Sequence, residues 1–169
     1  MVRLVNLPIQ DGIVELRRIA IEDAVEFIAL EADPEAKKFM GGPRCKTLGD
    51  VRSYVSENHA PDDLDLLVVT DRSSKQFLGR AGLLPNGPDE VELHCVLKKT
   101  AQGNGYGRAT FLILIRVAEM LGKSPVAIIH PENVMSLKLF KALGFVQSGL
   151  HRTDGWQDGH LVFRTKEFR

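Results

Sequence analysis

The residues best suited to chemistry form a glycine-dense loop, Gln102 to Arg108, with glycine at positions 103, 105 and 107. Glycine has no side chain to hold a ligand away from the backbone, and it adopts the positive φ angles that turn successive N–H groups to one side. Residues 91–95 alternate between apolar and polar, and residues 109–121 contain neither Gly nor Pro, which predicts a strand, a loop and a helix. The first N–H groups of such a helix have no partner and lie at the positive end of its dipole. The loop is therefore predicted to hold an anionic group such as a pyrophosphate.

Two other glycine-loop signatures do not fit this chain. The dinucleotide fingerprint G-x-G-x-x-G fails in both registers, because its third glycine would fall on Arg108 or Thr110. The P-loop fails because Gly122-Lys123-Ser124 would need a glycine where Val117 stands. The spacing that fits is Gln-x-x-Gly-x-Gly at positions 102, 105 and 107.

This motif resembles Gln/Arg-x-x-Gly-x-Gly/Ala, the loop with which the GNAT superfamily of N-acetyltransferases binds the pyrophosphate of acetyl-coenzyme A (acetyl-CoA). Further along, Asn133-x-x-Ser136, Leu143-Gly144-Phe145, Gly149 and Gly155-x-x-Asp158 are similar to the branch that includes ribosomal-protein N-terminal acetyltransferases. The resemblance implies an N-acetyltransferase that moves an acetyl group from acetyl-CoA to a primary amine by direct transfer in a ternary complex.

The rest of the chain supplies the elements that must position the loop. Strands are predicted at 13–19, 64–70, 76–84, 91–97, 125–130, 145–151 and 160–168, and helices at 20–32, 47–59, 109–121 and 133–143. Short polar turns predict an antiparallel meander of the second to fourth strands, and the crossover through the third helix predicts that the strands at 91 and 125 run parallel. This order is that of the GNAT fold. The expected fold class is α/β (α+β): a mixed, mostly antiparallel sheet with a central splayed parallel strand pair and helices on both faces.

The ends of the last predicted helix carry specific capping signals. Asn133 is placed to accept a hydrogen bond from the Ser136 N–H as the N-cap. Gly144 follows the helix, and a Schellman ending there predicts contact between Phe140 and Phe145.

Composition narrows the class of protein. The 169 residues are 44% hydrophobic and 26% charged, which predicts one soluble globular domain over residues 1–169. Lys+Arg and Asp+Glu number 22 each, so no net field favours nucleic acid or a membrane as a partner. The sequence shows no signal peptide, and its longest apolar run, Phe111 to Ile115, is too short to span a bilayer. With only Cys45 and Cys95 available for disulfides, a cytoplasmic location is expected.

The resemblance also implies which residues hold the cofactor. It assigns the backbone groups of Val96 and Leu97 to the pantetheine arm, and Asn133 and Ser136 to the same site. It assigns the pyrophosphate to the amides of the loop: Gln102, Gly103, Asn104, Gly105, Tyr106, Gly107 and Arg108. Two alternatives stay open, because Asn133 could serve only as a cap and Tyr106 could be a packing residue.

Glu92 is the candidate general base. A lysine-like amine is almost wholly protonated at neutral pH, so a group or a water chain must take a proton before the nitrogen can attack. Family members often carry an acidic base on the strand before the loop. Alternation places Glu92, His94 and Val96 on one face of that strand, where the first two can share a cleft. The alternative is a solvated glutamate without a catalytic role.

Other features leave questions open. Phe140 stands where many relatives carry a tyrosine that protonates the leaving thiolate, so no catalytic acid is assigned, and water or Ser136 could substitute. The missing phenol also motivates an alternative function: a silent acyl-CoA-binding sensor or regulatory module. No spacing supports a metal site, and Cys95 is expected in the core. A small-molecule amine and a protein N-terminus both remain as acceptors, and the chain could be a monomer or a homodimer.

Overall fold

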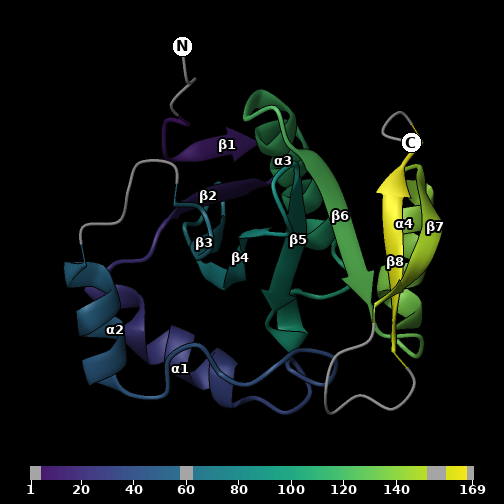
Figure 1. Ribbon diagram of the computed structural model, residues 1–169. Coiled ribbons are helices and arrows are strands. Elements are labelled where there is room, and N and C mark those ends of the chain that lie inside the picture. The colour runs from purple at the N-terminus through teal and green to yellow at the C-terminus, as the bar shows by residue number, and fades with distance from the viewer. Residues whose placement is uncertain (1–4, 58–62, 152–158, 167–169) are drawn as a thin grey trace.

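The computed structural model describes residues 5–57, 63–151 and 159–166, which form an eight-stranded sheet in the order β1-β2-β3-β4-β5-β6-β8-β7 (Figure 1). The strands are β1 (Ile9–Asp11), β2 (Val14–Arg18), β3 (Leu67–Asp71), β4 (Phe77–Pro85), β5 (Glu90–Leu97), β6 (Ser124–Ile129), β7 (Phe145–His151) and β8 (His160–Thr165). The pair β5–β6 is parallel, and every other neighbouring pair is antiparallel. The predicted mixed sheet with one parallel pair is confirmed.

Helices cover both faces of the sheet, as predicted. The helices are α1 (Ala24–Ala32), α2 (Leu48–Ser56), α3 (Tyr106–Met120) and α4 (Val134–Ala142). Alternation along β5 sorts its side chains between two cores, because successive residues of a strand point to opposite faces. Leu93 and Leu97 pack in the core that includes α3 and α4, whereas Val96 packs with Phe27 of α1 in the core on the other face.

The first elements differ from the prediction. The strand β1 was missed because it has only three residues and a weak pattern directly after Pro8. The first helix was predicted to begin at residue 20, but a short 3-10 turn, η1 (Ile21–Asp23), precedes α1. There the Asp23 carboxylate accepts the N–H of Ala20 at 2.8 Å and pairs with Arg17 at 2.7 Å.

The predicted caps of α4 are confirmed. The Asn133 side chain accepts from the Ser136 N–H at 3.2 Å. Gly144 has a φ of +87°, and the rings of Phe140 and Phe145 meet edge to face with centroids 5.1 Å apart. These two caps therefore fix where α4 begins and where it ends.

Gly82 on β4 leaves room for the backbone of Leu64 and Asp65 to cross the face of the sheet. A Cβ at this position would lie 2.5 Å from the carbonyl oxygens of both Leu64 and Asp65. The crossing is hydrogen-bonded on two sides. The Leu83 N–H donates to the Leu64 carbonyl at 2.8 Å, and the His94 ring lies 2.8 Å from the Asp65 carbonyl.

We expect Gly82→Ala to lower the free energy of unfolding by about 1–3 kcal/mol, because the added methyl group overpacks a backbone contact that cannot yield without moving β4. Urea denaturation measures the loss. Gly49→Ala is the matched control. Gly49 lies within α2, where a Cβ meets only the Thr47 hydroxyl at 3.5 Å, so alanine there should stabilise by up to about 1 kcal/mol. Equal stability of Gly82→Ala and the wild type would contradict the close crossing.

Candidate active site

The parallel strands β5 and β6 separate in the middle of the sheet. Their pairing joins Glu90 to Ser124, Val91 to Pro125 and Glu92 to Val126, and it ends there. Beyond that point β5 continues to Leu97 and β6 to Ile129. The inner edges of the two strands therefore leave backbone groups facing a gap, which is the predicted splay.

The glycine loop lies at the open end of this gap. Gly103 and Gly105 have φ angles of +79° and +84°, in the region that favours glycine, and Gly105 is the N-cap of α3. The side-chain amide of Gln102 donates to the Leu97 carbonyl at 3.2 Å, and that of Asn104 donates to the Gln102 carbonyl at 3.2 Å. The loop is thus tied to the end of β5, and the first N–H groups of α3 have no helical acceptor.

A cavity of about 490 Å³ joins the loop, the end of β5, the start of α4 and the segment after α1. Nine of the predicted cofactor residues line it: Val96, Leu97, Gln102, Gly103, Gly105, Gly107, Arg108, Asn133 and Ser136. Asn104 and Tyr106 do not line it. The Tyr106 hydroxyl donates to Asp71 at 2.8 Å, which ties the first turn of α3 to the end of β3.

Sequence reasoning did not single out several apolar lining residues. Phe111 follows Gly107 by one helical turn on α3, and Leu139 follows Met135 by one turn on α4; all four line the cavity. Residues four apart share a helix face, so this spacing could have identified Phe111 and Leu139 once Gly107 and the start of α4 were assigned to the site.

The cavity fits the phosphates and thiol arm of acetyl-CoA. A Cβ at Gly105 or Gly107 would extend into space whose nearest side-chain atoms are 3.9 Å and 3.8 Å away, so the missing side chains leave room beside the backbone. Main-chain N–H groups, a helix N-terminus and Arg108 supply positive potential, whereas Phe111 and Leu139 supply apolar surface. Anion-binding and apolar groups thus occur in one cavity.

Glu92 is the last residue of β5 that pairs with β6. It is half-buried, and its carboxylate has no hydrogen bond or ion pair among the described residues. Burial raises the pKa of Glu92 above its ordinary value. A carboxylate with a raised pKa and no partner is able to accept a proton.

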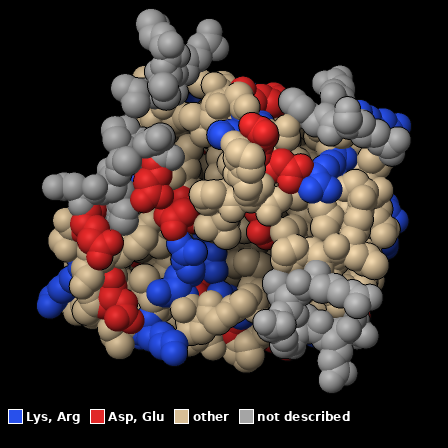
Figure 2. All heavy atoms as spheres, in the orientation of Figure 1, with Lys and Arg blue, Asp and Glu red and all other residues tan. Residues whose placement is uncertain are grey.

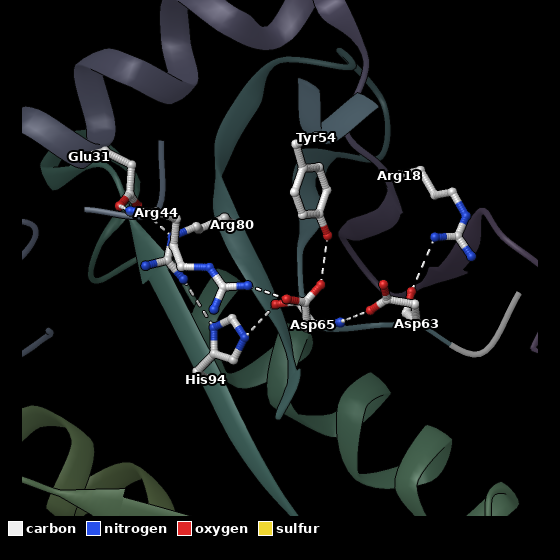
Figure 3. A network of polar contacts seen from close by, with 8 residues as sticks. All are labelled: Arg18, Glu31, Arg44, Tyr54, Asp63, Asp65, Arg80 and His94. Carbon is white, nitrogen blue, oxygen red and sulfur yellow. Dashed lines mark hydrogen bonds and ion pairs between the residues drawn. The ribbon is translucent and has the colours of Figure 1, made fainter. Parts of the chain in front are cut away.

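His94 does not share an open cleft with Glu92. Its ring is 5% exposed, and both ring nitrogens have partners: Arg80 Nη1 lies 3.2 Å from Nδ1, and the Asp65 carbonyl lies 2.8 Å from Nε2 (Figure 3). Because a guanidinium can only donate, Nδ1 accepts and Nε2–H donates. Burial and the charge of Arg80 lower the pKa of His94 to about 4, so the ring is neutral at pH 7.

Cysteine and metal chemistry find no support at this site. Burial raises the pKa of Cys95 to about 12, so this cavity-lining residue remains a thiol at neutral pH. In the described parts of the chain, no three His, Cys, Asp or Glu side chains are grouped so that they could hold a metal ion.

The model of the acetyltransferase (GNAT) domain matches residues 14–146. The chain belongs to the GNAT acetyltransferase family. As a GNAT acetyltransferase it is an enzyme that uses acetyl-CoA as the acetyl donor. No curated protein matches the chain. None of the helices in the described ranges is long and apolar enough to cross a membrane.

Solved structures share the GNAT fold over nearly the whole chain. An acetyltransferase from Bacillus anthracis is 16% identical with a TM-score of 0.75, covering 94% of this chain and 97% of that one. An acetyltransferase from Agrobacterium tumefaciens is 22% identical with a TM-score of 0.74, covering 95% and 94%. The spermidine N-acetyltransferase from Vibrio cholerae, solved with CoA and spermine, is 17% identical with a TM-score of 0.74, covering 91% and 94%.

We expect Gly105→Glu to weaken acetyl-CoA binding by about 100-fold or more, because it places bulk and a negative charge where the backbone is bare. Isothermal titration calorimetry measures the dissociation constant. Gly122→Glu is the matched control, since Gly122 also has a positive φ of +69° and does not line the cavity. Both variants place a glutamate at a positive φ, so unchanged affinity in Gly105→Glu would place the cofactor elsewhere.

Proposed function

We propose that the protein transfers the acetyl group of acetyl-CoA directly to the primary amine of a small molecule while both substrates are bound. The observation that carries the proposal is the position of Glu92, whose half-buried, unpartnered carboxylate lies where β5 and β6 separate. Glu92 does not line the cavity itself, but the glycine loop follows the strand that carries it, so the proton acceptor and the anion-binding site belong to one strand and the loop after it.

The cavity supports a division of the cofactor between two kinds of group. The N–H groups of Gly103, Gly105, Gly107 and Arg108 would hold the pyrophosphate, and the free backbone edge of β5 at Val96 and Leu97 would hold the arm that carries the thioester. Asn133 uses its side-chain oxygen for the cap of α4, which leaves its N–H₂ group to donate into the cavity.

Glu92 would remove a proton from the acceptor ammonium, directly or through water. The acceptor nitrogen then has a free electron pair. When bound, acetyl-CoA supplies an activated thioester carbonyl for that nitrogen to attack. A thiol pKa of about 8.5 makes the thiolate a tolerable leaving group without an acid from the protein. Phe140 is 2% exposed and packs against Phe111 and Phe145, so its position belongs to the core.

Direct transfer is favoured because the side chains near the gap are poor nucleophiles. Cys95 stays a thiol, and both nitrogens of His94 are occupied. Initial rates measured with both substrates varied should give intersecting double-reciprocal lines. Parallel lines would indicate an acetylated enzyme and would contradict the ternary complex.

The similarity to a spermidine N-acetyltransferase supports a small cationic amine as the acceptor. The cavity is lined by Glu35 and by the cations Lys38, Lys99 and Arg108, and Glu92 has no described partner. The resemblance of the closing segment to ribosomal-protein acetyltransferases makes a protein N-terminus the second candidate; part of that segment, residues 152–158, lies outside the described residues.

The acceptor is tested by measuring CoA release with a panel of polyamines, amino-sugar amines and amino-terminal peptides. Turnover with polyamines or other small cationic amines supports the proposal. Turnover with peptides alone would show that the acceptor is a protein N-terminus and would contradict a small-molecule acceptor. Tight acetyl-CoA binding without turnover on any amine would favour the silent sensor.

We expect Glu92→Gln to lower kcat by about 100- to 10,000-fold at neutral pH, because the amide cannot accept the proton. The wild-type rate should fall as the pH drops through the raised pKa of Glu92, since the base must be ionised, and this acidic limb should disappear in the variant. The dissociation constant of acetyl-CoA should change little.

Glu90→Gln is the matched control. Glu90 lies two residues earlier on the same face of β5, and Arg164 binds its carboxylate at 2.5 Å. Its removal should lower stability and leave the pH–rate profile unchanged. Retention of the acidic limb in Glu92→Gln would exclude Glu92 as the base.

A further inference from the structure

The segment after α1 forms one wall of the cavity with few backbone hydrogen bonds of its own. We call residues 35–40 the cavity wall; Glu35, Ala36, Lys38, Phe39 and Met40 line the cavity. Its backbone bonds include Lys37 N–H to the Asp33 carbonyl at 3.0 Å and Met40 N–H to the Lys37 carbonyl at 2.9 Å. Gly41-Gly42-Pro43 follows, so regular structure does not fix the position of the wall.

One buried carboxylate holds both ends of this segment. The side chain of Glu31, in the last turn of α1, is 1% exposed. Its Oε2 accepts from Lys37 Nζ at 3.0 Å and from the Arg44 backbone N–H at 2.6 Å. Lys37 Nζ also approaches the Gly42 carbonyl at 3.4 Å. The chain therefore leaves α1, forms the wall and returns to the same carboxylate.

The other carboxylate oxygen of Glu31 connects the cavity wall to β5 through Arg80 and His94. Arg80 on β4, with its side chain 4% exposed, donates from Nε to Glu31 Oε1 at 2.5 Å. Its Nη1 donates to His94, which lies on β5 between Glu92 and Val96. Figure 3 shows Glu31 on α1 facing Arg80 and Arg44, with His94 on the far side of Arg80.

Figure 2 shows where charged side chains lie on this face of the molecule. The face shown is hollowed near the lower end of β5, and Lys and Arg side chains gather beside the hollow toward α1.

Burial alone would raise the pKa of Glu31, but the charge of Arg80 and the hydrogen bonds from Arg80, Arg44 and Lys37 lower it. Glu31 is therefore a carboxylate at neutral pH, bound by two buried cations.

Stability alone does not account for this arrangement. Apolar residues of similar volume often stabilise as well as a buried ion pair does, and the wall already packs Ala36 and Met40 on the core that contains Phe27 and Val96. Apolar contacts are non-directional, whereas hydrogen bonds fix distance and angle. The ion pairs supply what packing lacks, which is a defined position of the wall relative to β5.

We propose that Glu31, Lys37 and Arg80 are positioning residues that hold the cavity wall opposite β5 and so fix the shape of the cavity in which the acceptor amine meets acetyl-CoA. The inference rests on the proposed function. The pyrophosphate site depends on the separate loop at 102–108, so loosening the wall should weaken acceptor binding more than acetyl-CoA binding.

The test uses Lys37→Met, which releases the wall while leaving the Glu31–Arg80 pair intact. Hydrogen exchange of the free protein should accelerate in residues 35–44 and stay unchanged in α3. The KM for an amine acceptor should rise by about tenfold or more, while the dissociation constant of acetyl-CoA should change by less than about threefold. Lys37→Arg, which keeps a cationic donor, should restore both properties.

Lys75→Met is the matched control, because Lys75 also binds a buried carboxylate, Glu15 at 2.7 Å, and does not line the cavity. It should leave KM unchanged. Uniformly faster exchange in Lys37→Met with an unchanged KM would show a merely structural role and overturn the proposal. If the wild type fails to bind acetyl-CoA or to turn over, the proposed function fails, and the exchange data alone decide whether Lys37 positions the wall.

Discussion

The structure depends on one interruption of hydrogen bonding, where β5 and β6 stop pairing after Glu92 and Val126. Unpaired backbone groups in the middle of a sheet are costly unless water or a ligand satisfies them. The gap persists because each strand keeps its outer neighbour. β5 remains paired with β4 as far as Leu97, and β6 remains paired with β8 as far as Ile129. The sheet thereby presents main-chain donors and acceptors to a cavity without losing its continuity.

The closed end of the gap is fastened by side chains. Arg164 on β8 reaches across β6 to Glu90 on β5 with two hydrogen bonds, at 2.5 Å and 2.9 Å. A bidentate arginine–carboxylate pair fixes orientation as well as distance. The Arg164–Glu90 pair lies two residues before Glu92, so β5 and β6 are held together up to the point where they separate. Neutral His94 matters here too, because an imidazolium on the same face would stabilise the Glu92 carboxylate and lower its pKa.

Local signals in the sequence predicted the parts of the fold that local physics determines. Alternation along residues 91–97 predicted the two faces of β5, and the caps at Asn133 and Gly144 predicted the bounds of α4. Long-range side-chain contacts were not predictable. Glu31 and Arg80 are 49 residues apart, and no periodicity relates them. Tyr106 could have faced either side of the loop, and only its partner Asp71 shows which side it takes.

This difference between local and long-range contacts explains why the acetyl donor can be predicted from the sequence, whereas the acceptor amine cannot. The proposed donor site is built mainly from backbone: bare N–H groups at glycines, a helix N-terminus and an open strand edge. Its requirements are glycines at fixed spacing and a strand–loop–helix order. Chains only 16–22% identical to this one share the fold over more than nine-tenths of its length. The cavity wall, in contrast, is held in place by side chains of α1 and β4, through ion pairs that form only after folding. Many combinations of side chains can build such a wall, so the family follows from the backbone, whereas the acceptor is decided by contacts that the motif does not contain.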